Sequence, residues 1–144
     1  MEKLGKTLQT HLIEQGNAFS MRTVCQIGIQ LLQMLQQLHL IGKVYNDLKL
    51  DNILVSKEST DDQILIKLID FGLATSFIDA QGMHIKREQT SDFKGNLAMS
   101  SIHAMNFETM SRRDDLLSLT YVLVYMCQGQ LDFLNVDPNI EQYL

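Results

Sequence analysis

The chain has 144 residues, which is enough for one ordinary domain and not for two. Its 12 Lys and Arg against 17 Asp and Glu give a net charge of −5, and this balance argues against a dedicated nucleic-acid binder. Hydrophobic residues make up 45% of the chain, so wholesale disorder is not expected. No apolar run is long enough to span a bilayer, no signal peptide is visible and only two cysteines occur, so we expect a cytoplasmic or nuclear protein without membrane contact.

A long amphipathic helix is predicted from Ser20 to Ile41. Ser20 is a suitable N-cap, and Gly42 suits the left-handed residue that closes a helix. The apolar side chains recur at helical spacing, and they are Val24, Ile27, Leu31, Leu35 and Leu38, with Leu32 and Met34 widening the stripe. We expect Met34 and His39 to pack at the end of this helix.

Two β-rich runs follow, at 53–55 and 64–69, separated by the polar turn KESTDDQ, and they predict a hairpin. The segment from 70 to about 111 has no clear period, and irregular segments of that length are usually functional or mobile. A last helix is predicted at about 113–127. Its apolar residues cover almost every face, which is typical of a helix inside a protein.

Two polar clusters carry the chemistry. The first is Tyr-Asn-Asp-Leu-Lys-Leu-Asp-Asn at 45–52, before the first strand, and the second is Asp-Phe-Gly at 70–72, directly after the second strand. Because a hairpin returns the chain, Asp70 is expected near Asn52. Carboxylate and amide oxygens suit Mg²⁺ rather than Zn²⁺. Asp47 is positioned to accept a hydroxyl proton, and Lys49 to offset phosphate charge.

Each of these residues is weak evidence singly, because a loop Asp is usually a turn-former. The combination of Asp-Leu-Lys-x-x-Asn, a hairpin and Ile-Asp-Phe-Gly is specific. With these motifs the chain resembles a protein kinase. It is most similar to the casein kinase I family in MEKLGKTL, YNDLKLDNILV, IDFGLA, GNLAMSSIHA and SRRDDLLSLTYVLVYM, which together extend over residues 1 to about 134.

The resemblance implies an α+β, mainly α-helical fold: the large, C-terminal lobe of a kinase in truncated form, with a short β-hairpin that carries the catalytic and metal-binding loops. It also implies a Ser/Thr kinase that transfers the γ-phosphoryl group of ATP to a protein substrate. Asp47 would be the catalytic base and Lys49 would contact the γ-phosphate. Asn52 and Asp70 would hold Mg²⁺ and with it ATP. Asp115 matches the aspartate that anchors the catalytic-loop backbone in kinases, although it is equally explained as a first-turn acid favoured by the helix dipole.

Several positions depart from the family pattern. Tyr45-Asn46 replaces the usual His-Arg, so we predict no activation through a phosphate held by that arginine. Ala98 stands where the family carries an arginine, near the basic residues with which the family recognises acidic or pre-phosphorylated substrates. Lys86 and Arg87 either substitute for that arginine or form a solvated pair. Thr120 replaces a glycine in the last helix, which adds volume there.

The smaller lobe of a kinase is not found in this sequence. No two of its eight glycines are two residues apart, so a Gly-x-Gly-x-x-Gly loop is absent, as is a strand resembling Val-Ala-Ile-Lys. We therefore keep an alternative, an inactive pseudokinase-like interaction module or a truncated gene product. About five large apolar side chains of the last helix would lie uncovered, which forgoes ~1.5–3 kcal/mol each. The isolated chain should then be marginally stable or associate, unless a partner covers that helix.

Overall fold

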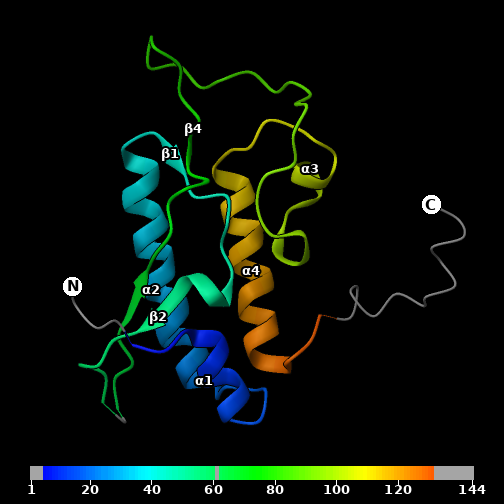
Figure 1. Cartoon of the computed structure of the whole chain (residues 1–144). Helices are drawn as coiled ribbons and strands as arrows, with labels where there is room; N and C mark the ends of the chain where they lie inside the picture. The colour runs from blue at the N-terminus through cyan, green and yellow to red at the C-terminus, as the bar shows by residue number, and fades with distance from the viewer. Residues whose placement is uncertain (1–4, 61, 132–144) are drawn as a thin grey trace, which may run out of the picture.

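Two long helices that lie side by side form the centre of the molecule, and the computed structural model describes residues 5–60 and 62–131 (Figure 1). They are α2 (Met21–Leu40) and α4 (Arg112–Gln128). The shorter helix α1 (Leu8–Glu14) joins the same core through Leu8 and Leu12, both fully buried. Sequence periodicity did not identify α1, although Thr7 caps its first turn by accepting a hydrogen bond from the N–H of Thr10.

The predicted helix over 20–41 is confirmed as α2. The Ser20 hydroxyl accepts a 3.2 Å hydrogen bond from the N–H of Thr23, and Gly42 adopts a positive φ of 78° just beyond the helix. Four of the predicted apolar positions are buried: Val24, Ile27, Leu31 and Leu35. Leu38 and Met34 are half-buried, whereas Leu32 is exposed because it lies on the outer side of the stripe.

Helix α4 matches the helix predicted at about 113–127 and extends it by one residue at each end. A capping box starts it, in which Ser111 and Asp114 bond to each other's backbone N–H, and Gly129 ends it in the left-handed conformation. The helix is not buried on all sides, although its apolar pattern is typical of an interior helix. Polar Asp114, Asp115 and Ser118 are buried along with Leu119, Val122 and Met126, while Leu116 and Val124 are exposed.

The predicted hairpin is present as β2 (Ile53–Val55) and β3 (Ile66–Leu68), which pair antiparallel with Ile53 opposite Leu68. Strand β3 is shorter than the predicted run at 64–69. Two glutamine side chains of α2 accept the backbone hydrogen bonds that a neighbouring strand would otherwise accept. Gln26 accepts from the N–H of Ile64, and Gln30 accepts from the N–H of Ile66, the first residue of β3. The polar positions of α2 therefore hold the edge of the hairpin.

The segment after the hairpin is largely irregular, as its lack of periodicity indicated, and it passes over one end of the helix pair (Figure 1). It contains β4 (Thr75–Ser76), the 3₁₀ helix η2 (Leu97–Met99) and α3 (Ile102–Met105). Strand β4 pairs with β1 (Lys43–Val44), which the sequence did not predict. Among the described residues the fold is thus mainly helical with two small antiparallel sheets, in agreement with the predicted α+β class.

No helix within 5–60 and 62–131 has the length and apolarity required to cross a bilayer.

Candidate active site

A buried carboxylate from α4 fixes the loop that carries the predicted catalytic residues. The loop runs from β1 to the 3₁₀ helix η1 (Leu50–Asn52). Asp115 accepts hydrogen bonds of 2.9 Å from the backbone N–H of both Tyr45 and Asn46, one on each carboxylate oxygen. These contacts confirm that Asp115 anchors the loop backbone. His39 lies 2.7 Å from Asp115 Oδ2 through Nε2, a polar contact in addition to the packing expected for this residue.

Asp47, Lys49 and Asn52 form one hydrogen-bonded group. Lys49 Nζ donates to Asp47 Oδ2 at 2.8 Å, and Asn52 Nδ2 donates to the same oxygen at 2.8 Å and to the Asp47 carbonyl at 3.0 Å. Asp47 is only 5% exposed, and its other oxygen, Oδ1, is buried with no hydrogen-bond partner in the described structure. A buried acceptor without a donor is costly, which favours a bound group that supplies one.

Asp70 is held near Asn52 by the backbone hydrogen bonds of the preceding residue, Ile69. The Ile69 N–H donates a 2.9 Å hydrogen bond to the Asn52 carbonyl, and the Tyr45 hydroxyl donates to the Ile69 carbonyl. The Ile69 N–H and carbonyl therefore tie the end of the hairpin to the predicted catalytic loop, residues 45–52. Asp70 itself is exposed, has a left-handed φ of 57° and accepts a 3.1 Å hydrogen bond from the N–H of Gly72.

The oxygen atoms of Asn52 and Asp70 suit a magnesium ion. Both amide hydrogens of Asn52 are engaged by Asp47, so its side-chain oxygen is left as the acceptor. Mg²⁺ is usually held by one or two such oxygen ligands together with substrate phosphates and waters. Within the described residues no three His, Cys, Asp or Glu side chains gather at metal-binding distance.

Tyr45 and Asn46, which replace the family's His-Arg pair, are both integrated into the site. Tyr45 is fully buried, its ring packs edge-on against Phe71 at 5.3 Å, and burial raises the pKa of its phenol, so it stays a hydrogen-bond donor. Asn46, at a left-handed φ of 69°, donates from Nδ2 to the Leu73 carbonyl at 2.8 Å and to Thr75 Oγ1 at 2.9 Å. Neutral hydrogen bonds thus connect the catalytic loop to the segment after Asp70.

Arg87 is not a freely solvated cation, because its guanidinium lies 2.6 Å from the Glu108 carboxylate. Glu108 is also within 3.2 Å of His103 and 3.5 Å of Arg113. The hydrogen bond from Arg87 lowers the pKa of Glu108, so this carboxylate stays charged. Sequence reasoning missed Glu108, because a single acid in an irregular segment carries no pattern that reveals its partners.

The other two departures have simple structural outcomes. Ala98 is half-buried just before Met99. Thr120 is exposed, and its hydroxyl donates a 2.9 Å hydrogen bond to the Leu116 carbonyl of the preceding turn, so the added volume meets no packed neighbour.

The family model described as "Protein kinase domain" matches residues 1–143. The chain belongs to the protein kinase family. It is 34% identical over 146 residues to casein kinase 1-like protein HD16 of rice, Oryza sativa subsp. japonica, covering 100% of this chain and 21% of that protein. It is also 31% identical over 144 residues to casein kinase I homolog 2 of Saccharomyces cerevisiae, covering 99% of this chain and 26% of that protein.

A third relative, casein kinase I homolog 1 of Schizosaccharomyces pombe, is 30% identical over 146 residues, covering 99% of this chain and 33% of that protein. The chain therefore spans between a fifth and a third of the length of these relatives. These matches make it casein kinase I-like. They bear on the family and not on the roles of individual side chains.

Proposed function

We propose that this chain carries the catalytic segment of a Ser/Thr kinase, in which Asp47 accepts the proton of a substrate Ser or Thr hydroxyl as ATP donates its γ-phosphoryl group. The observation that carries the proposal is the state of the Asp47 carboxylate. One oxygen is held by Lys49 and Asn52, while the buried Oδ1 has no partner among the described residues. A hydroxyl donating to Oδ1 would satisfy this acceptor and orient the nucleophile.

Lys49 and Asn52 fix the orientation of Asp47, because both donate to the same oxygen at 2.8 Å. Lys49 would also contact the γ-phosphate, while Asn52 and Asp70 would hold Mg²⁺ and thereby ATP. When bound, Mg²⁺ supplies positive charge that offsets the charge of the phosphates. Tyr45 and Asp115 act as positioning residues, since they tie the loop to Ile69 and to α4. The described residues contain no glycine-rich loop. Covering the phosphates of bound ATP therefore requires contacts beyond those described.

The proposal is tested by measuring transfer of labelled γ-phosphate from ATP to mixed Ser and Thr peptides. Asp47→Asn keeps the size of the side chain and removes its basicity, so transfer should fall by about 10²–10⁴-fold, the usual contribution of a general base. Asp51→Asn, at an exposed neighbouring position, is the matched control and should retain activity. Equal transfer by the chain and its Asp47→Asn variant would contradict the catalytic role and favour a non-catalytic interaction module.

Binding of ATP is measured separately by titrating a fluorescent ATP analogue with and without Mg²⁺. We expect Asp70→Asn to weaken the magnesium-dependent part of the affinity, because it removes a charged ligand. An affinity that does not depend on Mg²⁺ in the unmodified chain would contradict the assignment of Asn52 and Asp70.

A further inference from the structure

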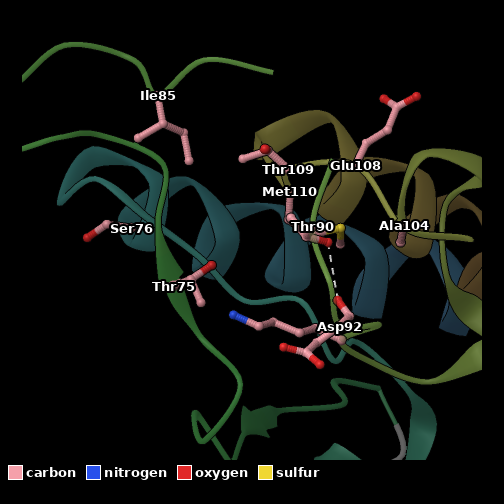
Figure 2. A pocket seen from close by; sticks show the side chains of 10 residues that line it. Thr75, Ser76, Ile85, Thr90, Asp92, Ala104, Glu108, Thr109 and Met110 are labelled. Atoms are coloured by element: carbon pink, nitrogen blue, oxygen red, sulfur yellow. Dashed lines mark hydrogen bonds between the residues drawn. The ribbon is translucent and has the colours of Figure 1, made fainter. Parts of the chain in front are cut away.

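A small cavity of about 230 Å³ lies beside the catalytic loop, between β4, the segment around 90–94 and the loop that follows α3 (Figure 2). Its volume is below the ~300–1,000 Å³ of sites for drug-sized ligands, so it fits a single side chain better than a free metabolite. No residue assigned to catalysis lines it.

Two contacts place this cavity next to Asp47. Thr75, which lines the cavity, accepts a 2.9 Å hydrogen bond from Asn46, the residue before Asp47. Gly95, which follows the lining residue Lys94, lies so near the loop that a Cβ there would be 2.4 Å from the Asn46 carbonyl oxygen. A peptide whose hydroxyl reaches Asp47 would therefore place a nearby side chain at this cavity.

The residues that line the cavity carry no net positive charge. Its charged lining residues are Lys94, Asp92 and Glu108. Glu108 already pairs with Arg87 at 2.6 Å, so the arginine offsets the charge of that carboxylate. Lys94 and Asp92 are exposed and of opposite sign. A phosphorylated side chain carries a charge of about −1.5 to −2 and would find one lysine opposed by one carboxylate.

The remaining lining is hydroxyl and apolar. Threonine hydroxyls and methyls of Thr75, Thr90 and Thr109 surround it, and Ile85, Ala104 and Met110 add apolar surface (Figure 2). The Thr90 hydroxyl donates to the Phe107 and Asp92 carbonyls, at 3.0 and 3.3 Å, so its hydrogen is not free to bind a ligand. An uncharged side chain gains contact with this surface without an unpaired charge.

We propose that this cavity receives an uncharged side chain of the protein substrate, close in sequence to the acceptor Ser or Thr, and disfavours an acidic or phosphorylated one. The proposal rests on the proposed function for the position of the acceptor. It makes Thr75, Asp92 and Lys94 specificity-determining residues.

Peptide binding is measured by fluorescence anisotropy with the full chain, so that the result does not depend on turnover. Each labelled peptide contains one Ser acceptor and differs from its pair at a single flanking position, which holds either leucine or phosphoserine. At the position that enters the cavity, we expect leucine to bind about tenfold more tightly or better, because a phosphate loses water there and meets no net positive charge among the lining residues. Equal affinities at every position, or tighter binding of phosphoserine, would overturn the proposal.

Asp92→Lys tests the location, because it adds two positive charges at the rim of the cavity. Glu58→Lys makes the same change in charge on the exposed hairpin turn and is the matched control. We expect Asp92→Lys to remove or reverse the preference for leucine and Glu58→Lys to leave it unchanged; the opposite pattern would overturn the assignment. If Asp47→Asn transfers phosphate as well as the unmodified chain while the leucine preference persists, the proposed function fails and the binding preference stands.

Discussion

At the scale of single residues, Asp115 links the catalytic loop to α4 through both of its carboxylate oxygens. It is 1% exposed and accepts from two backbone N–H groups of the loop as well as contacting His39. Buried N–H groups require acceptors, so the carboxylate contributes to folding as well as to the position of Asp47. Its effect should therefore appear in stability as well as in activity.

Asp115→Ala leaves the N–H groups of Tyr45 and Asn46 buried without an acceptor. Each such group costs about 1–3 kcal/mol, so we expect the free energy of unfolding to fall by roughly 2–6 kcal/mol. Urea denaturation measures this change, with Asp115→Asn expected to be intermediate because it keeps one oxygen acceptor. Exposed Asp51→Ala should have little effect; a similar loss in both alanine variants would contradict the anchoring role.

The motif spacing anticipated which residues come together at this site but not all of their partners. Asp47, Lys49 and Asn52 lie within one short loop, so local geometry brings them into contact. The Glu108–Arg87 and His39–Asp115 pairs could not be predicted in this way, because their members are distant in the sequence and are brought near only by packing. The positive φ angles of Asn46 and Asp70 were likewise not visible in the pattern.

At the scale of elements, α2 supports the hairpin through polar side chains as well as packing. Gln30 donates to the Ile64 carbonyl at 2.9 Å and accepts from the Ile66 N–H at 3.1 Å. Periodicity correctly predicted the helix and its buried side, since these depend on local spacing. It could not predict that this glutamine would replace a strand partner, because that pairing depends on how the hairpin packs on the helix.

Gln30→Ala removes both contacts with the hairpin. At about 0.5–1.5 kcal/mol for each hydrogen bond, the free energy of unfolding should fall by roughly 1–3 kcal/mol. Hydrogen exchange of the Ile66 amide should accelerate at the same time. Gln37→Ala, on the exposed side of α2, controls for the higher helix propensity of alanine. Unchanged exchange at Ile66 would show that Gln30 does not hold the hairpin edge.

At the scale of the whole molecule, Glu108 connects three separate parts of the chain. Arg87 belongs to the irregular segment, His103 to α3 and Arg113 to α4, and all three approach this one carboxylate. The connection depends on the negative charge of Glu108. A pKa below its ordinary value of 4.5 means that folding favours the ionised form.

Glu108→Gln should therefore lower the melting temperature at neutral pH. The stabilisation is fully present above pH 4.5 and is lost as the pH falls through the lower pKa of the folded state. The difference in melting temperature between the unmodified chain and the variant should thus shrink below about pH 4.5, and thermal melts at several pH values measure it. Glu58→Gln is the surface control. A difference that stays constant down to acidic pH would contradict the ionic connection.

An apolar surface formed by α2 and α4 matches the expectation that one side of the last helix is uncovered. Two cavities of about 540 and 500 Å³ share Ile29 and Leu32, so they form one continuous surface, and Leu116 lines the first and Val124 the second. All four side chains are exposed. Contiguous apolar surface of this kind favours association. That a partner covers this surface stays a prediction.

Ile29→Glu combined with Leu32→Glu should reduce the fluorescence of a bound hydrophobic dye and shift sedimentation towards the monomer. Both side chains are exposed, so the charges should not disturb the core. Met83→Glu and Leu97→Glu, at exposed positions on the irregular segment, form the matched control and should change neither signal. If the control pair lowers both signals equally, the surface has no special role.

The handedness of the backbone limits which residues fit at positions 46 and 70. Asn46 and Asp70 both occupy the left-handed region, which costs most residues roughly 1–2 kcal/mol and is tolerated best by glycine, asparagine and aspartate. A β-branched side chain at either position would strain the backbone even if every contact were kept. The backbone geometry therefore favours glycine, asparagine or aspartate at these two positions, whatever their role in phosphate chemistry.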